Sequence, residues 1–301
     1  PRAGIWFDGI VADLEKAGRV TAGGRLPASV RELLAGDPER LKAARATAAK
    51  VETMIAELRA GKIRRPAWLL SDEAVHLGPP VPDPQKVICL GLNYVDHCRE
   101  QEGKFGRSVE PPERPVLFAK YPSALTGPND PIRLPPASVA EKVDFEVELA
   151  LVIGRTAKGV KKKDAMDYVA GYMVMNDVSA RDCQFMDKQW VRAKSFDTFA
   201  PCGPWLVTAD EIKRPDRLKL WSVLNGETMQ SGSTRDLIHK LPAVVAFISE
   251  AITLQPGDII ITGTPAGVGI FRDPPVLLQP GDTIECGIQE IGTICNSVER
   301  A

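Results

Sequence analysis

The chain of 301 residues has no stretch that approaches the ~20 consecutive apolar residues of a membrane-spanning helix. It also has no excess of either charge, because 38 Lys and Arg residues against 39 Asp and Glu residues give a formal net charge of -1. Proteins that bind nucleic acid usually carry a basic patch or stripe, and this sequence has none. The sequence therefore predicts neither a membrane nor a nucleic-acid partner.

Cysteine and histidine are both scarce. The six cysteines are scattered without a Cys-x-x-Cys pair, and the chain has three histidines. We interpret the cysteines as reduced thiols of an intracellular protein, mostly small core residues, and expect none of them to act as a nucleophile. This interpretation predicts a cytoplasmic location.

The chain divides into two parts of different sequence character. Residues 1–80 contain two helical patterns, ASVRELLAGD and LKAARATAAKVETMIAELRAG, and predict a small N-terminal α+β domain. Residues 81–301 consist mainly of short β-rich runs split by Gly and Pro, with few helical patterns between them. Because strands and helices do not alternate regularly, we predict an α+β fold, predominantly β, in the form of a mixed β-sandwich roll with peripheral helices.

Acidic residues recur on one face of a predicted strand. In VDFEVELALVIG the apolar and acidic residues alternate, so that Glu146 and Glu148 project side by side. The apolar run GYMVM is followed by Asn176 and Asp177, so Asp177 would lie at a strand terminus. Neighbouring carboxylates repel unless a cation neutralises them, and an all-oxygen set suits Mg²⁺ or Mn²⁺. The alternative is a solvated strand face and an unrelated turn aspartate.

A histidine and a glutamate lie three residues apart in GLNYVDHCREQE. If this segment is helical, His97 and Glu100 meet on one face, where the carboxylate would orient the imidazole as a general base. A surface ion pair is the alternative. Lys194 in WVRAKSFDTFAPCGPW and Lys120 in PVLFAKYPSA lie in apolar settings, where each lysine either extends toward solvent or is buried beside a negative partner.

A glycine-rich segment, TGTPAGVG at residues 262–269, follows the apolar run DIII. Such a turn can present backbone N–H groups and a hydroxyl group to an anion, or it is an ordinary tight turn. It lacks the Gly-Lys-Ser/Thr ending of a phosphate loop.

These motifs, taken in order along the chain, resemble the fumarylacetoacetate hydrolase family over nearly all of residues 86–301. The similarity is closest to the branch that includes the FAH-domain-containing proteins and the acylpyruvate hydrolases. The motifs that carry it are GLNYxxHxxE, FAKYPSALTGP, VDFEVELALVIG, GYMVMNDVSARD, AKSFDTFAPCGPW, NGE, GDIIITGTPAGVG and GDTIECGI.

The resemblance implies a role for each of the residues identified above. It makes the three acidic residues the ligands of Mg²⁺ or Mn²⁺, namely Glu146, Glu148 and Asp177. It implies catalytic roles for three more residues, a His–Glu dyad on a mobile lid and a catalytic lysine: His97, Glu100 and Lys194. It implies substrate contacts for a further set: Lys120, Arg181, Gln184 and Thr264. The family also implies a homodimer and a small 2-keto or 2,4-diketo acid as substrate.

The activity that we expect first is metal-dependent hydrolysis of a C–C bond in a 2,4-diketo acid of the acylpyruvate or fumarylpyruvate type. The products would be pyruvate and a carboxylic acid, with His97 activating the water. A second hypothesis uses the same enolate chemistry without water, for tautomerisation or decarboxylation of oxaloacetate or isomerisation of 2-hydroxy-dienedioates, as in aromatic catabolism. A non-catalytic protein of the same fold is the third.

Overall fold

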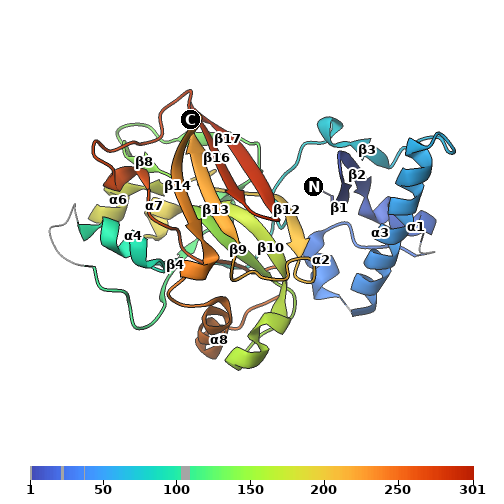
Figure 1. Cartoon of the computed structure of the whole chain (residues 1–301), viewed down its shortest axis with the longest axis horizontal. Coiled ribbons are helices and arrows are strands. Elements are labelled where there is room, and N and C mark those ends of the chain that lie inside the picture. Colours follow the sequence, from blue (N-terminus) through green and yellow to red (C-terminus); the bar gives the residue numbers. More distant parts are fainter. Residues whose placement is uncertain (1, 22–23, 37, 103–108) are drawn as a thin grey trace. The chain divides into compact units, whose positions relative to one another are not determined.

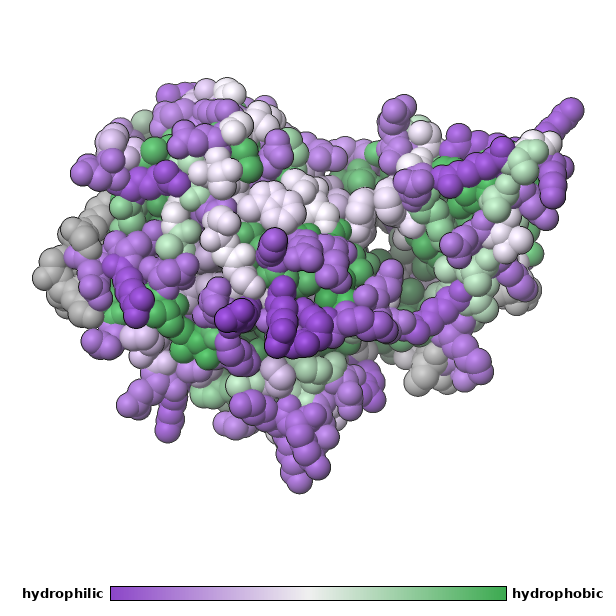
Figure 2. Space-filling view, viewed as in Figure 1, coloured by the Kyte–Doolittle hydropathy of each residue, from purple (hydrophilic) through white to green (hydrophobic). Residues whose placement is uncertain are grey.

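The computed structural model describes residues 2–21, 24–36, 38–102 and 109–301 (Figure 1). They fall into two compact units, Pro1–Leu77 and Gly78–Ala301, and each is described by itself. Hydrophilic side chains cover much of the visible surface of both units (Figure 2).

The smaller unit is a three-stranded sheet with helices. The strands, in the order β1-β2-β3, are Gly4–Phe7, Ile10–Asp13 and Leu69–Ser71. The helices are α1 (Leu14–Thr21), α2 (Val30–Ala35), α3 (Pro38–Arg59) and the 3-10 turn η1 (Asp72–Ala74). Asp8 and Gly9 both have positive φ, 39° and 84°, which allows the two-residue turn between β1 and β2. Val51 and Ile55 of α3 contribute to the core of this unit.

The larger unit is built on a seven-stranded and a five-stranded sheet, counted within the described residues. The first has the order β5 (Val116–Lys120), β4 (Val87–Gly91), β15 (Ile259–Ile261), β9 (Val147–Ile153), β10 (Val169–Asn176), β12 (Ala200–Thr208) and β6 (Leu125–Thr126). The second has the order β14 (Glu227–Ser233), β13 (Lys219–Leu224), β16 (Thr283–Ile288), β17 (Gly292–Arg300) and β7 (Ile132–Leu134). A two-stranded pair joins β8 (Val143–Asp144) to β11 (Ser179–Ala180). Parallel and antiparallel pairs occur in the same sheet, so it is mixed.

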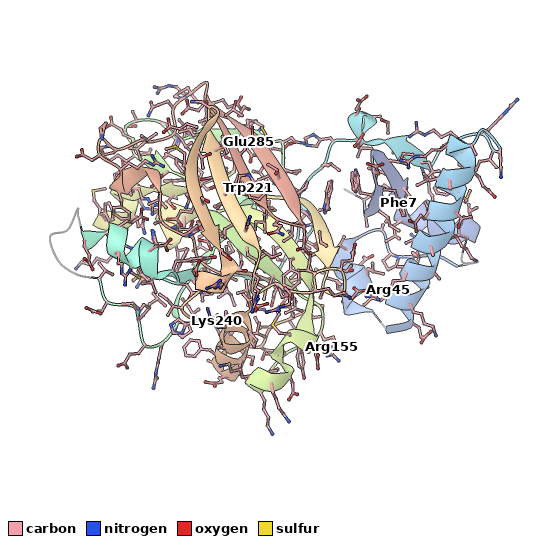
Figure 3. The ribbon with its side chains drawn as sticks, viewed as in Figure 1. Phe7, Arg45, Arg155, Trp221, Lys240 and Glu285 are labelled. Atoms are coloured by element: carbon pink, nitrogen blue, oxygen red, sulfur yellow. The ribbon has the colours of Figure 1, made fainter. Side chains whose placement is uncertain are left out.

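The two large sheets pack against each other. Strands β9 and β10 of the first sheet contact β13 and β16 of the second, with one continuous apolar core between them. Trp221 lies on β13 (Figure 3), opposite Gly287 of β16. A Cβ atom at position 287 would stand 2.3 Å from the indole ring, so the glycine makes room for the aromatic side chain. This architecture confirms the predicted mixed β-sandwich roll.

Helices and short turns lie at the edges of these sheets. They are α4 (Val95–Glu100), α6 (Arg181–Met186), α7 (Val191–Lys194), α8 (Leu241–Ala251) and the 3-10 turns η2 (Pro122–Ala124), η3 (Lys162–Tyr168), η4 (Thr234–Asp236) and η5 (Gly269–Phe271). Helix α8 has Pro242 in its first turn, where a missing N–H costs nothing. The run DLIHKLPAVVAFISEAIT predicts an amphipathic helix that includes His239, but the helix begins at Leu241 and His239 precedes it.

The strand expected over residues 143–153 is broken at Phe145 and Glu146. Side-chain oxygen atoms accept hydrogen bonds from the backbone N–H groups that would pair with a neighbouring strand if the strand were continuous. Asp144 Oδ1 accepts a hydrogen bond from the Phe145 N–H at 2.9 Å, and Asn176 Oδ1 accepts one from the Glu146 N–H at 3.0 Å. Both faces of β9 are buried, so the acidic face is not the solvated face of the alternative interpretation.

Candidate active site

Three carboxylates converge beside the start of β9. Glu148 lies on β9, Glu146 immediately precedes it, and Asp177 follows the last residue of β10. The antiparallel register places Met175 opposite Glu148, and the Asp177 N–H donates to the Glu146 carbonyl at 2.8 Å. One oxygen atom from each carboxylate lies within 4.8 Å of the others, and all three residues are buried. Asp177 thus forms one acidic triad with two glutamates that lie 31 and 29 positions earlier in the chain.

Buried cations neutralise two of these three carboxylates. The Lys194 Nζ donates to Glu146 Oε2 and to Asp177 Oδ2, each at 2.8 Å. The Lys120 Nζ donates to Asp177 Oδ1 at 2.6 Å. Arg181 Nη2 lies 2.7 Å from Glu146 Oε1, as an ion-pair contact and not an aligned hydrogen bond. Each lysine predicted from its apolar setting therefore has a negative partner.

Glu148 differs from the other two members of the triad. Its Oε2 accepts a short hydrogen bond from the Gly263 N–H, and no basic side chain among the described residues lies within ion-pair distance. Burial and the charges of Asp177 and Glu146 raise the pKa of Glu148 well above its usual range. For Glu146, burial also favours the neutral form, but Lys194 and Arg181 outweigh it and lower the pKa. The triad thus holds one uncompensated carboxylate.

This donor set fits a hard divalent cation. Three carboxylates and no nitrogen or sulfur ligand are typical of Mg²⁺ or Mn²⁺ sites, and a cation would relieve the repulsion that raises the pKa of Glu148. The same three residues were singled out from their alternation and strand-end position.

His97 and Glu100 form a pair within α4. The Nδ1 of His97 lies 2.5 Å from Glu100 Oε1, as the three-residue spacing predicted for a helix. Glu100 Oε2 in turn accepts a hydrogen bond from the Gly267 N–H at 2.7 Å. His97 is only 8% exposed. The carboxylate therefore holds one ring nitrogen in place, and the segment after β15 holds the carboxylate.

The glycine-rich segment at residues 262–269 presents N–H groups to anions, and the anions are the protein's own carboxylates. Gly263 donates to Glu148, Gly267 to Glu100, and Gly269 to Asp144 at 2.8 Å. Gly267 has φ +105°, and a Cβ atom there would stand 2.3 Å from a backbone carbonyl oxygen. Only glycine fits this conformation, so the loop can reach both the triad and the His–Glu pair.

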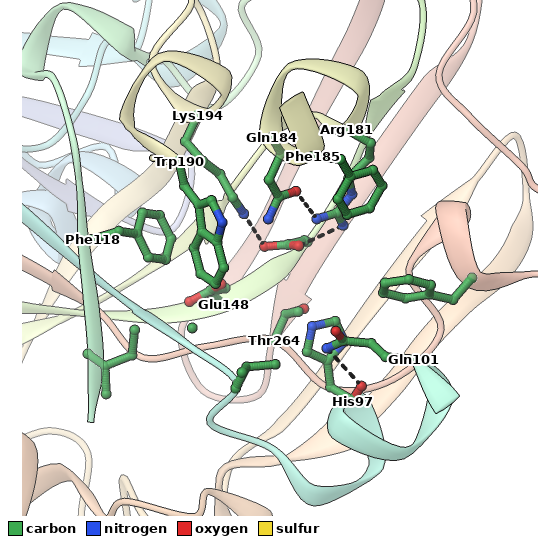
Figure 4. Close-up of a pocket in the computed structure, with 15 residues that line it drawn as sticks. His97, Gln101, Phe118, Glu148, Arg181, Gln184, Phe185, Trp190, Lys194 and Thr264 are labelled. Atoms are coloured by element: carbon green, nitrogen blue, oxygen red, sulfur yellow. Dashed lines mark hydrogen bonds and ion pairs between the residues drawn. The ribbon is translucent and has the colours of Figure 1, made fainter. Parts of the chain in front are cut away.

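A cavity of about 210 Å³ lies between the acidic triad and His97 (Figure 4). Seven of the residues proposed for the site line it: His97, Glu146, Glu148, Arg181, Gln184, Lys194 and Thr264. The described lining residues do not include Asp177, Lys120 or Glu100. Glu100 contacts the lining residue His97, Asp177 accepts from the lining residue Lys194, and Lys120 donates to Asp177. The segment EGKFGRSVEPPE at residues 102–113 has the Gly, Pro and charged composition of a mobile loop, and its residues 103–108 lie outside the described residues.

Asp144 is a site residue that the sequence analysis did not single out. It is fully buried and accepts hydrogen bonds from Arg181 Nε at 2.8 Å and from the N–H groups of Gly269 and Ile270. It therefore anchors both the guanidinium that reaches Glu146 and the end of the glycine-rich loop. The signal for it was present, since Asp144 is the first acid of the same alternation.

Gln230 gave no signal in the sequence. It lies on β14 of the second sheet, and its Nε2 donates to Thr264 Oγ1 at 2.7 Å while its Oε1 accepts from the Val147 N–H at 3.0 Å. The Thr264 hydroxyl donates to the Val147 carbonyl at 3.0 Å. Gln230 thus ties the threonine to the strand that carries Glu148.

Comparisons with known proteins agree with this geometry. Residues 86–299 match the fumarylacetoacetate (FAA) hydrolase C-terminal family. A mitochondrial oxaloacetate tautomerase of Xenopus laevis is 47% identical over 232 residues, which cover 76% of this chain and 70% of the relative.

Two solved structures are similar as well. A fumarylacetoacetate hydrolase from Exiguobacterium antarcticum has a TM-score of 0.77 at 34% identity, covering 100% of this chain and 95% of that one. A 5-carboxymethyl-2-hydroxymuconate delta-isomerase from Mycobacterium smegmatis has a TM-score of 0.67 at 40% identity, covering 79% and 86%. Within the described ranges, every helix is too short or too polar to cross a lipid bilayer. The chain belongs to the fumarylacetoacetate hydrolase family.

Proposed function

We propose that this protein is a divalent-metal-dependent enzyme that interconverts the enol and keto forms of a 2-oxo acid, as the oxaloacetate tautomerases do. The observation that carries the proposal is the joining of a buried carboxylate triad and a His–Glu pair in one small cavity. The 47% identity to an oxaloacetate tautomerase favours this chemistry over the hydrolysis that we expected first. The expected homodimer and cytoplasmic location stay predictions.

The acidic triad would hold the metal. Glu146, Glu148 and Asp177 are the ligands in this proposal, and Mg²⁺ or Mn²⁺ are the ions that their oxygen atoms suit. When bound, such an ion polarises a carbonyl group and stabilises negative charge on its oxygen. Lys120 donates to Asp177 Oδ1 and to the Val178 carbonyl and is not among the described lining residues of the cavity, so it would act by positioning that ligand.

His97 would move the proton. Because Glu100 engages Nδ1, proton exchange with a substrate falls to Nε2. In the keto-to-enol direction, Nε2 takes a proton from C3, the C–H electron pair becomes the C2–C3 double bond, the C2–O π pair moves onto oxygen, and the protonated Nε2 delivers the same proton to that oxygen. The reverse direction returns the proton to C3, so no atom is gained or lost. Lys194, whose ammonium group lines the cavity, would stabilise the charge on the oxygen.

The remaining cavity residues would orient the substrate. Arg181, Gln184 and Thr264 all present polar groups to the cavity, and Arg181 Nη1 donates to Gln184 Oε1 at 2.9 Å. We assign to them contacts with the substrate's carboxylate and carbonyl oxygens. Their own hydrogen bonds fix them before a substrate arrives, which reduces the entropy lost on binding.

Hydrolysis of an acylpyruvate is the second candidate, because a relative with 34% identity over the whole chain is named a fumarylacetoacetate hydrolase. The same His97–Glu100 pair would then deprotonate a water molecule that attacks the distal carbonyl group. The C–C bond would break to give pyruvate and a carboxylic acid.

Product analysis separates the two reactions. The enzyme is incubated with enol-oxaloacetate and with acetylpyruvate in Mg²⁺, Mn²⁺ or EDTA, with His97→Ala as the inactive control. We expect metal-dependent loss of the enol absorbance without release of pyruvate or CO₂. Release of pyruvate with an equal amount of acetate would establish the hydrolase. No turnover of these two compounds or of phenylpyruvate in the presence of metal would overturn both candidates.

A further inference from the structure

One side of the cavity is an apolar wall made of Leu90, Leu92, Phe118 and Trp190. The Trp190 and Phe118 rings meet edge to face, with centroids 5.4 Å apart and an interplanar angle of 69°. The Trp190 ring also lies against Gly91, where a Cβ atom would stand 2.5 Å from the indole Cζ3. The indole ring can occupy this position because residue 91 has no side chain. Figure 4 shows Phe118 and Trp190 side by side at this edge of the cavity.

The apolar wall begins directly beside the acidic triad. The Lys194 Nζ lies 5.1 Å from the centre of the Phe118 ring, and the same ammonium group bonds to Glu146 and Asp177. A 2-oxo acid whose carboxylate and carbonyl oxygens are held at the triad therefore has the wall next to it. The group attached to C3 is the part of such a substrate that extends away from those oxygens.

The cations of the cavity offer little to a second carboxylate. Of the described lining residues, Lys194 bonds to two triad carboxylates, and Arg181 contacts Asp144 and Glu146. The Nδ1 of His97 is engaged by Glu100, and its Nε2 is assigned to the proton transfer. A carboxylate placed against the apolar wall would lose its hydration without gaining an ion pair, which is costly, whereas an apolar group there gains from burial.

We propose that the cavity selects 2-oxo acids that carry one carboxylate and a flat apolar group at C3, the arylpyruvates, over dicarboxylic 2-oxo acids such as oxaloacetate. This substrate class rests on the proposed function for its chemistry. The proton passes between the C2 oxygen and C3, and no bond to the aryl group is made or broken. The aryl ring lies against Trp190 and Phe118 throughout.

The first test compares turnover. Tautomerisation of phenylpyruvate and of oxaloacetate is measured with the Mg²⁺-loaded enzyme, and we expect kcat/KM to be about tenfold or more higher for phenylpyruvate because its ring is buried. A higher kcat/KM for oxaloacetate would overturn the selectivity and leave the proposed function standing. Turnover of neither compound would overturn the proposed function.

The second test measures binding without turnover. Phenyllactate and malate have a hydroxyl group at C2 in place of the carbonyl and cannot enolise, so calorimetric titration of the Mg²⁺-loaded enzyme compares binding of the two C3 groups without turnover. We expect phenyllactate to bind about tenfold more tightly than malate. Tighter binding of malate would overturn the selectivity, whatever the enzyme's activity.

Two variants connect the selectivity with the wall. Trp190→Ala removes the indole, and Gly91→Ala adds a methyl group that forces the indole from its place. Each should lower the ratio of kcat/KM for phenylpyruvate to that for oxaloacetate by about tenfold. Tyr121→Ala is the matched control, because this aromatic residue is 60% exposed and does not line the cavity. A ratio unchanged in both wall variants, each folded as judged by its Tm, would overturn the assignment.

Discussion

Two carboxylate clusters, one in each unit, show opposite ways of surrounding a buried acid. In the smaller unit, Glu15 contacts three arginines, Arg2, Arg19 and Arg25, at 2.7–2.9 Å. The side chains of these arginines are 50%, 59% and 75% exposed, so water screens the pairs. In the larger unit, Glu148 is buried beside two other carboxylates. Three cations surround Glu15, whereas no basic side chain among the described residues lies within ion-pair distance of Glu148.

The difference separates a structural acid from a candidate ligand. Hydrogen bonding from Arg19 and the charges of Arg25 and Arg2 lower the pKa of Glu15, because they favour its charged form against the effect of burial. Burial, Asp177 and Glu146 raise the pKa of Glu148. The surroundings of Glu15 are complete without a ligand, whereas those of Glu148 become favourable only when a proton or a cation binds.

The largest expected effect is on metal binding. Glu148→Gln removes the uncompensated charge, and we expect Mg²⁺ and Mn²⁺ affinity to fall by more than the ~10–100-fold that loss of a supporting residue costs. Calorimetric titration measures it, with Glu15→Gln as the control that leaves affinity unchanged. Equal metal affinity in Glu148→Gln and the wild type would remove this residue from the ligand set.

The next effect is on catalysis. His97→Ala should lower kcat by about 10²–10⁴-fold, the usual contribution of a general base, without a comparable loss of metal affinity. His76→Ala, in the smaller unit, is the control. Steady-state kinetics with saturating Mn²⁺ checks this, and a wild-type kcat for His97→Ala would show that another group moves the proton.

Stability should respond strongly to Asp144. Asp144→Asn breaks a buried pair with Arg181 and should lower the free energy of unfolding by about 3–5 kcal/mol, because it leaves a buried guanidinium without full compensation. Asp216→Asn breaks an exposed pair with Arg214 and should cost less than about 1 kcal/mol. Chemical denaturation compares the two, and similar losses would contradict the contrast between buried and exposed pairs.

The pH dependence of stability should separate the clusters by sign. Because the folded pKa of Glu148 is raised, its stabilising contribution is complete below its unfolded value, about 4.5, and is lost as the pH rises through the folded pKa. The Tm of the metal-free protein should therefore fall with rising pH, and less so in Glu148→Gln or with Mg²⁺ present. The same slope in the wild type and in Glu148→Gln would assign the effect to other groups.

The smallest effect is expected at Glu15. Its folded pKa is lowered, so its contribution is present above the unfolded value and is lost as the pH falls through the folded pKa. Glu15→Gln should lower Tm slightly at pH 7 and not at all in strong acid, with no change in kcat. Scanning calorimetry at both pH values checks this, and a loss of activity would contradict a purely structural part for Glu15.

The sequence by itself determined the features that depend on neighbours along the chain. The three-residue spacing of His97 and Glu100 brings their side chains together on any helical turn. An Asn-Gly pair favours a two-residue hairpin turn, and Asn225 and Gly226 form such a turn between β13 and β14, with φ of 51° and 86°. The resemblance in motif order identified the family, and with it the mixed β-sandwich roll.

Only the tertiary structure decided which charges are paired. Lys194 meets Glu146 across 48 positions and Gly263 meets Glu148 across 115, and no local pattern encodes such contacts. The same is true of the hydrogen bond from Gln230 to Thr264 and of the packing of Trp190 against Gly91. The alternation in residues 143–149 identifies acids that share a face, but their pKa values depend on burial and on the distance to each cation. Those quantities exist only once the strands and loops have packed together.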